Sequence, residues 1–348
     1  MHAYRTQHAR SIAAALGAAL LFGASTPAAK NLAGAVHPVL LAGLLYAGSG
    51  IGLSLFRLAR AQPLRLPRAD IPWLAAAVLS GGIVGPVLLM WGLSATSAAS
   101  ASLLLNLEGV FTALLAWFVF RENFDRRIAL GMALIVAGGM LLVFEPASVH
   151  GGSAGAFAVA AACLAWAVDN NLTRKAAAAD PSVVAAVKGL VAGAVNIALA
   201  FALGVEWPGT TRALAAACIG FLGYGVSLAL FVSALRELGA ARTGAYFSTA
   251  PFLGVALAFA MLGESPGALF WPAAALMLWG VWLHVTERHE HEHAHEPIEH
   301  EHRHVHDEHH RHEHGFPWDG AEPHTHVHRH ARLVHRHPHY PDLHHRHH

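Results

Sequence analysis

Ten long apolar segments, each continuous enough to form a membrane-crossing helix, dominate the chain up to Val285. The hydrocarbon core of a bilayer is about 30 Å thick, so a helix needs roughly 17–25 mostly apolar residues to cross it. We therefore predict an all-α membrane protein with ten membrane-spanning helices: Ser11–Ala29, Val39–Phe56, Ile71–Leu93, Ala98–Phe120, Ile128–Phe144, Ala154–Thr173, Val183–Leu203, Ala213–Leu235, Ala240–Leu262 and Ala268–Val285.

The polar residues are concentrated at the C-terminal end. The chain is 55% hydrophobic and 13% charged, whereas soluble domains are about 25% charged. Of 22 Asp and Glu residues, 12 follow Val285, and 23 of 28 histidines lie between His289 and His348. The chain thus divides into an apolar body (residues 1–285) and a His-rich tail (residues 286–348). Cys163 and Cys218 lie inside apolar segments, where we expect small buried side chains rather than a disulfide or a CxxC site.

The distribution of Lys and Arg between the segments predicts the orientation. Thirteen of them fall on one side of the membrane and only Lys30 and Arg212 on the other, with Lys188 inside a segment. An even number of crossings also places both termini on the same side. We therefore expect a multi-pass protein of a bacterial inner membrane, with both termini and the tail in the cytoplasm.

An internal repeat divides the body into two halves. Phe111–Glu122 (FTALLAWFVFRE) aligns with Leu253–Glu264 (LGVALAFAMLGE), an offset of 142 (253 − 111) along the chain. Because each half holds an odd number of spans, the second half must be inserted upside down, an architecture found in secondary transporters. The predicted domains are a first five-helix repeat (1–148), a second five-helix repeat (149–285) and the tail (286–348). The glutamates that end the two aligned segments are expected to anchor loops.

The body resembles the EamA-type transporters of the drug/metabolite transporter superfamily. The residues that carry the resemblance are LFGASTPAAK at Leu21–Lys30 and the helix ends FRE at Glu122 and LGE at Glu264, within two five-helix halves. The resemblance covers about residues 11–285 and implies a secondary carrier, often an exporter. Substrates of the family range over amino acids, nucleotide precursors, drugs and metals. The tail lies outside the family pattern and is similar to that of nickel and cobalt resistance carriers.

Glu108 is the main candidate for proton coupling. It lies near the centre of its segment, two residues after Asn106. An ionisable residue in mid-membrane costs about 2.5–3.5 kcal/mol on insertion scales, so it is a candidate functional group by default. The carboxyl could carry a proton during transport or help to hold a cation. Alternatively, it is a protonated structural group bonded to a neighbouring helix.

A second polar cluster comprises Asp169, Asn170 and Asn171, near the cytoplasmic end of the sixth segment. Lys188 lies at a similar depth in the seventh segment, which returns from the same side. We expect an Asp169–Lys188 ion pair, in which each charge lessens the burial penalty of the other. The pair could lock two helices together or act as a gate. Other polar, aromatic or sulfur-containing side chains are expected to serve packing more than ligand binding: Tyr46, Met90, Trp91, Ser94, Tyr224, Tyr246 and Ser248.

The tail is expected to be disordered and to bind divalent metal. It lacks an apolar period, so no core can form, and histidine-rich tracts are typical of sites for zinc, nickel, copper and cobalt. With neutral histidines its charge is 7 − 12 = −5, which attracts cations, although affinity alone does not select the metal. A pH-sensitive segment without metal is the alternative. The candidate ligands are His289, His291, His293, His295, His300, His302, His304, His306, His309, His310, His312, His314, His324, His326, His328 and His330.

Two transport hypotheses follow. In the first, the protein is a proton-coupled exporter of nickel or cobalt. In the second, it exports an amino acid or small metabolite, and the tail is a metal-responsive regulatory segment. An anchored metal-sensing or storage protein is a third class, which needs far fewer spans. We expect no enzymatic activity and no permanent cofactor, with Ni, Co or Zn bound at the tail. The expected partners are the lipid bilayer and the transported solute or metal ion, with no nucleic acid; a homodimer is compatible with this interpretation.

Overall fold

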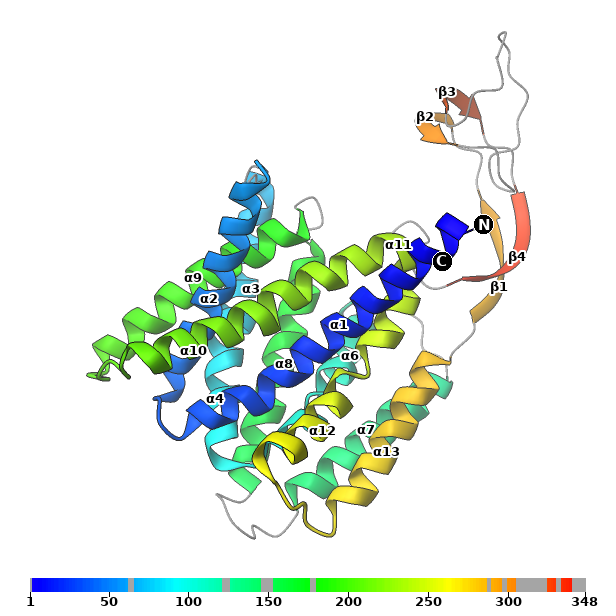
Figure 1. Cartoon of the computed structure of the whole chain (residues 1–348). Coiled ribbons are helices and arrows are strands. Elements are labelled where there is room, and N and C mark those ends of the chain that lie inside the picture. The colour runs from blue at the N-terminus through cyan, green and yellow to red at the C-terminus, as the bar shows by residue number, and fades with distance from the viewer. Residues whose placement is uncertain are drawn as a thin grey trace. The chain divides into compact units, whose positions relative to one another are not determined.

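The computed structural model describes residues 2–61, 66–120, 126–144, 153–175, 180–286, 289–295, 299–304, 324–329 and 333–339. The chain divides into two compact units, Met1–Thr286 and Glu287–His348. The described part of the first unit is helical throughout (Figure 1). Its elements are α1 (His2–Ala33), α2 (Pro38–Ala59), η1 (Arg68–Asp70), α3 (Ile71–Ala77), η2 (Val78–Val84), α4 (Gly85–Ala95), α5 (Ala98–Leu104), α6 (Leu107–Phe120), α7 (Arg126–Val143), α8 (Ser153–Lys175), α9 (Pro181–Ala202), α10 (Thr210–Gly220), η3 (Phe221–Val226), α11 (Ser227–Phe247), α12 (Ala250–Leu262) and α13 (Phe270–Val285).

Nine helical stretches of the described residues are long and apolar enough to cross a membrane. They cover the first nine predicted segments: Ala9–Ala33, Pro38–Ala59, Arg68–Ala95, Ala98–Val119, Arg126–Val143, Ser153–Thr173, Pro181–Ala202, Thr210–Leu235 and Arg242–Leu262. The tenth segment forms α13, which is apolar but has only 16 residues. At 1.5 Å per residue it is about 24 Å long, somewhat short of the hydrocarbon thickness. The prediction of an all-helical membrane body is confirmed.

Large apolar side chains cover the outside of this bundle. Leu58 is 75% exposed, Phe144 72% and Phe118 71%. An apolar surface of this kind indicates contact with another apolar phase, which in a multi-pass protein is the lipid.

Two of the spans change their helical winding, and two are interrupted. The elements η2 and η3 are π-helical turns inside the third and eighth spans. The fourth span is interrupted by a turn at residues 105–106, and the ninth by a turn at 248–249. Both kinds of irregularity recur at an offset of 143 (221 − 78 and 248 − 105), one more than the offset of the sequence repeat. The predicted span Ala98–Phe120 is present as Ala98–Val119, but the turn inside it was not predicted.

A further kink lies at Gly239, inside α11. Its φ of 80° and ψ of 168° are non-helical, and a positive φ of this kind favours glycine because glycine has no Cβ. The kink separates the eighth from the ninth span, where the sequence also predicted a boundary. In the alignment of the two halves it corresponds to Ser97, whose side chain caps the start of α5 by accepting a bond from the Ser100 N–H at 3.0 Å.

Small residues let the helices approach closely. Helix α2 packs along α9, α7 along α13, and α1 against both α11 and α12 (Figure 1). A Cβ added to Gly193 of α9 would lie 2.6 Å from the backbone N of Ala47 on α2, and one added to Gly189 would lie 2.6 Å from the Cα of Gly50. Close approach through small residues stabilises helix pairs in lipid, where no hydrophobic effect drives association.

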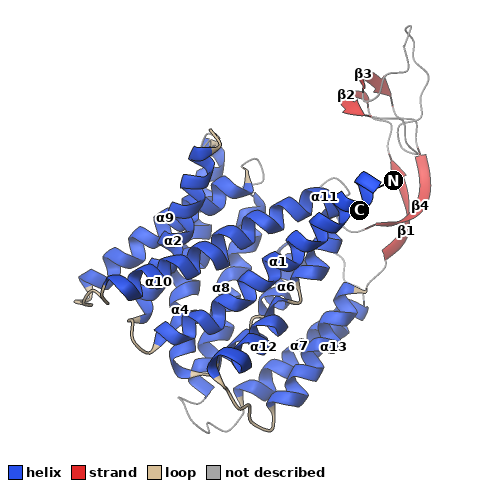
Figure 2. Ribbon diagram, in the orientation of Figure 1, coloured by secondary structure: helices blue, strands red, loops and turns tan. Residues whose placement is uncertain are grey.

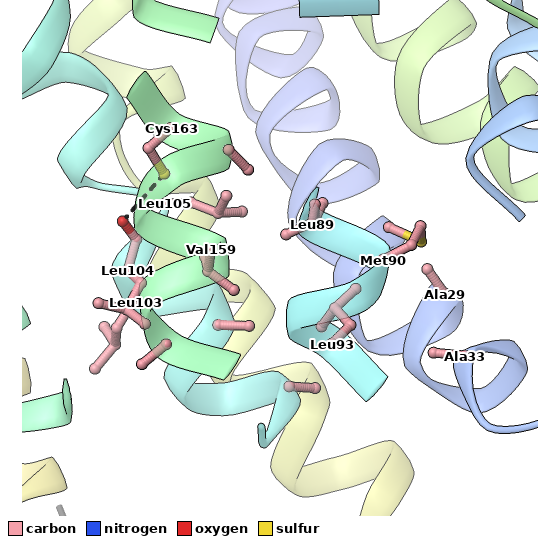
Figure 3. Packing of buried hydrophobic residues seen from close by; sticks show 14 of the residues in the cluster. Ala29, Ala33, Leu89, Met90, Leu93, Leu103, Leu104, Leu105, Val159 and Cys163 are labelled. Carbon is pink, nitrogen blue, oxygen red and sulfur yellow. Dashed lines mark hydrogen bonds between the residues drawn. The ribbon is translucent and has the colours of Figure 1, made fainter. Parts of the chain in front are cut away.

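The apolar interior joins α5 and α8 near the break in the fourth span. Figure 3 shows Leu103 and Leu104 beside Val159 and Cys163 of α8. All four side chains are buried, and the Cys163 thiol donates to the Leu104 carbonyl at 3.5 Å. Cys163 is thus the buried small side chain that was expected. Cys218 is exposed instead, because α10 packs against α2 on only part of its surface.

At the start of α9, Asp180 joins two helices. It caps α9 by accepting from the Ser182 N–H at 2.8 Å, and it lies 3.5 Å from Arg57 of α2. Bonds from the Ser182 side chain and backbone, aided by Arg57, lower the pKa of Asp180. The pair therefore fixes the beginning of α9, two turns before Lys188.

The second unit contains four described strands: β1 (His289–His295), β2 (Glu299–His304), β3 (His324–Arg329) and β4 (Leu333–His339) (Figure 2). β1 pairs with β4, and β2 with β3, both antiparallel. The prediction of disorder is corrected for these residues: the regular His-x-His alternation has the period of two that extended strands share. His306, His309, His310, His312, His314 and His330 lie outside the described residues.

Candidate functional site

The ion pair expected between the sixth and seventh spans is present. Lys188 Nζ on α9 donates to both Asp169 oxygens on α8, each at 2.7 Å, and the Thr173 hydroxyl donates to Asp169 Oδ1 at 3.0 Å. The Asp169 side chain is 6% exposed and the Lys188 side chain 18%. A buried pair with this geometry compensates part of the cost of removing both charges from water.

Glu108 lies in the first turn of α6, directly after the break at residues 105–106. Asn170 Nδ2 of α8 donates to Glu108 Oε1 at 2.9 Å and to Thr112 Oγ1 at 3.3 Å. Asn170 directly follows Asp169 in α8, so this bond brings Glu108 into the neighbourhood of the Asp169–Lys188 pair. The three predicted groups Glu108, Asn170 and the ion pair therefore form one polar cluster between α6, α8 and α9.

The two other predicted amides have different roles. Asn106 lies at the helix break, where its Nδ2 donates to the carbonyl of Leu103 in the preceding turn at 2.9 Å. Among the described residues no hydrogen bond joins it to Glu108. Asn171 Nδ2 donates to the carbonyls of Thr112 and Ala167 at 3.2 and 2.9 Å, which ties α8 to α6 beside the cluster.

The π-helical turn η2 supplies a carbonyl that the sequence did not indicate. The Gly81 carbonyl accepts from the Tyr46 hydroxyl and from Trp166 Nε1, each at 2.8 Å. Changed winding alters which carbonyls are used within the helix, and π-turns are frequent at functional sites. The Gly81–Gly82 pair in an apolar segment was the available signal for this position.

A side chain at Gly81 would displace the ion pair. An added Cβ would overlap the carboxylate of Asp169, so we expect Gly81→Ala to destabilise the protein by about 1–3 kcal/mol, the usual cost of overpacking. The check is the thermal unfolding midpoint of the purified protein in detergent. Gly109→Ala is the matched control, because nothing lies within 4 Å of a Cβ there; equal midpoints for both variants would contradict the prediction.

Aromatic rings from both halves meet beside Tyr46. The centroids of Tyr46 and Tyr224 are 5.7 Å apart, those of Phe22 and Tyr224 are 6.2 Å apart, and those of Phe22 and Phe247 are 5.3 Å apart. Tyr46 and Tyr224 were expected to serve packing, and these contacts are of that kind. They also place the Tyr224 ring beside Tyr46, whose hydroxyl bonds the Gly81 carbonyl.

A second charged arrangement lies where α4 meets α5. Lys30 of α1 donates to the carbonyls of Leu93 and Thr96, while Glu264, which follows α12, accepts from the backbone N–H groups of Ala98 and Ala99. A cavity of about 460 Å³ adjoins it, lined in part by Lys30, Ser94, Leu262 and Glu264. Ser94 donates only to the Trp91 carbonyl of its own helix, at 2.7 Å.

A metal site cannot be assembled from the described side chains. No group of three or more His, Cys, Asp or Glu among the described residues is arranged to hold an ion. In the tail, the two strand ladders have a regular backbone register. It pairs histidine with histidine at six positions: His289 with His339, His291 with His337, His293 with His335, His300 with His328, His302 with His326, and His304 with His324.

Comparison with known proteins gives a consistent set of relatives. The model of the EamA-like transporter family matches twice in tandem, over residues 9–144 and 153–286. The chain is 29% identical over 288 residues to an uncharacterized transporter of Methanothermobacter thermautotrophicus, covering 76% of this chain and 83% of the relative. It is 31% identical over 255 residues to a probable terminal-alkyne amino-acid exporter of Streptantibioticus cattleyicolor, covering 68% and 84%. A crystal structure of 23% identity has the same fold, with a TM-score of 0.58 over 79% of this chain and 96% of the other.

Proposed function

Because the chain belongs to the EamA-like transporter family and is therefore a membrane transporter, we propose that it exports a small zwitterionic solute of the amino-acid type in exchange for protons. The observation that carries this proposal is the buried cluster in which Glu108 bonds Asn170, the neighbour in sequence of Asp169 in the Asp169–Lys188 pair.

The cluster has the chemistry to hold a solute with both charges. A solute carboxylate can replace Asp169 as the partner of Lys188, and a solute ammonium can then bind the Asp169 carboxylate. Such an exchange leaves no charge buried without a partner, which would otherwise be costly. Two further observations favour an organic solute: the absence of a metal-donor group among the described side chains, and the name of the Streptantibioticus relative, an amino-acid exporter.

Glu108 is the group that we assign to proton coupling. A charged carboxyl inside the membrane is energetically costly. Binding a proton removes that cost and therefore favours the conformations of the transporter in which Glu108 is more deeply buried. Its bond to Asn170 links that change to α8, which carries Asp169. Proton entry from outside would then drive the solute outward.

The transport cycle that we propose is alternating access between two inverted repeats. Support comes from the two tandem family matches and from the recurrence of π-turns and helix breaks at one common offset along the chain. Five spans per repeat would give the second repeat the opposite orientation, with both termini in the cytoplasm of a bacterial cell. Reporter fusions after residues 34, 61 and 286 test the orientation; a periplasmic signal at residue 286 would contradict it.

The direct test is transport by the purified full chain in liposomes under an imposed pH gradient. We expect proton-driven flux of one or more radiolabelled amino acids and none of ⁶³Ni²⁺ or ⁵⁷Co²⁺ beyond leakage. Metal flux without amino-acid flux would reverse the assignment in favour of the second candidate.

That second candidate is an exporter of nickel or cobalt, and the tail register favours it. Each of the two strand ladders contains three His–His pairs, one at every second position. Alternate positions of a strand share one face. Neutral imidazole is a common ligand for these metals, so the tail could deliver Ni, Co or Zn to the inner mouth. Under the amino-acid proposal, the same tail is a metal-responsive regulatory segment.

Deleting residues 287–348 separates these two roles for the tail. We expect the truncated chain to lose Ni²⁺ binding in equilibrium dialysis but to keep the pH-driven amino-acid flux of the parent, because the polar cluster lies entirely within Met1–Thr286. The matched control keeps the length and replaces the tail histidines by asparagine. Loss of a demonstrated Ni²⁺ flux in both variants would instead make the tail part of a metal pathway.

A further inference from the structure

The corner between α4 and α5 is held by two opposite charges from other helices. Lys30 Nζ donates to the Leu93 carbonyl at 2.5 Å and to the Thr96 carbonyl at 2.7 Å. The last carbonyls of a helix have no partner within the helix, and a cation there is also favoured by the helix dipole. Lys30 therefore fastens the end of α4 to α1.

Glu264 makes the complementary contact on the other side of the corner. Its Oε1 accepts from the Ala98 N–H at 2.7 Å and its Oε2 from the Ala99 N–H at 2.8 Å. These are the first N–H groups of α5, and they have no carbonyl partner within that helix. Bonds to a carboxylate are roughly twice as strong as bonds between neutral groups. Because Glu264 follows α12, it joins the second half of the chain to the first.

Helices α12 and α5 approach each other closely beneath this contact. A Cβ added to Gly254 of α12 would lie 2.8 Å from Ser102 Oγ of α5. Ser102 is 1% exposed, and its hydroxyl has no hydrogen-bond partner in the described part of the chain. The cavity of about 460 Å³ described above lies next to Lys30 and Glu264. Separation of α12 from α5 would therefore join that cavity to the Ser102 position.

We propose that Lys30 and Glu264 form a clamp that keeps the transport pathway shut at this face, and that opening there releases Glu264 from α5. The inference rests on the proposed alternating-access function. It assigns to Glu264 a role beyond anchoring a loop, since the same carboxylate bridges the two repeats. The clamp is made in the present structure, which is therefore closed at the α4–α5 corner.

The test measures access to Ser102 rather than transport. In a chain with Cys163→Ser and Cys218→Ser, a Ser102→Cys substitution is labelled with a membrane-impermeant maleimide in nanodiscs, where both faces are accessible. We expect Glu264→Ala to raise the labelling rate about tenfold, which corresponds to about 1.4 kcal/mol, because the substitution removes both hydrogen bonds between Glu264 and α5. Glu206→Gln is the control, since that glutamate is exposed in the loop between α9 and α10.

Lys30→Gln is the second variant, and it should also raise the labelling rate of the cysteine at position 102. The test therefore remains decisive if the Glu264 variant does not fold. Labelling at the parental rate in a folded clamp variant would overturn the proposal. Faster labelling together with no flux of any amino acid or metal would support the clamp and refute the proposed function, so the two failures are distinguishable.

Discussion

Replacing Glu108 with glutamine should abolish proton-driven transport while leaving the fold intact. A glutamine there keeps an oxygen that can accept from Asn170 Nδ2, as Glu108 Oε1 does at 2.9 Å, but it cannot bind and release a proton. We expect the flux driven by a pH gradient to fall by roughly two orders of magnitude, the range seen when a positioned proton-transfer group is removed. Proteoliposomes with an imposed gradient give the measurement.

Solute exchange without a gradient provides the internal control for this variant. Counterflow of labelled against unlabelled solute needs the binding site but no net proton movement, so Glu108→Gln should retain it. Glu206→Gln, in an exposed loop, should match the parent in both assays. If Glu108→Gln transports at the parental rate under a gradient, Glu108 is a structural carboxyl and the coupling group lies elsewhere.

Breaking the ion pair should have the largest effect on stability. Lys188→Met leaves Asp169, which is 4% exposed, without its cation, and removal of one partner of a buried pair typically costs about 3–5 kcal/mol. The double variant Asp169→Asn with Lys188→Met removes both charges and should recover most of that loss. The stability of both variants is measured in detergent, with size-exclusion chromatography as the readout of unfolding. Arg212→Met, at an exposed residue, is the control.

Transport by the double variant shows whether the Asp169–Lys188 pair only holds α8 and α9 together or also binds the solute. If the pair binds solute, the double variant should be stable yet inactive in both driven flux and counterflow. A stable double variant that transports at the parental rate would show that the pair only locks α8 to α9, and the proposed exchange of partners with a zwitterion would be wrong.

The spans and the ion pair could be predicted because both depend on short-range information. Apolar length alone identifies a crossing helix. Asp169 and Lys188 lie close together in the sequence, on consecutive helices, so their similar depth follows from the loop between them. The proximity of Glu108 to that pair is different: its contact with Asn170 joins two helices that are not consecutive in the chain, and no local pattern specifies which helices become neighbours.

The helix breaks and the Gly81 carbonyl could not be predicted for a related reason. A π-turn leaves backbone groups that can bond partners from elsewhere in the fold, and the local sequence does not specify those partners. Tyr46 and Trp166 bond Gly81 from two other helices, and Glu264 of the second half reaches Ala98 of the first. In the tail, the His-x-His alternation has the period of an extended strand, but the lack of an apolar face favoured the prediction of disorder.

The interruption at residues 105–106 has a mechanical consequence. Helix α5 has seven residues and spans about 10 Å; Glu264 binds its first two N–H groups, and Glu108 follows just beyond its last turn. An uninterrupted helix over the whole span would have no such junction between α5 and α6. Under the two proposals above, α5 therefore links the group that binds the proton to the Lys30–Glu264 clamp.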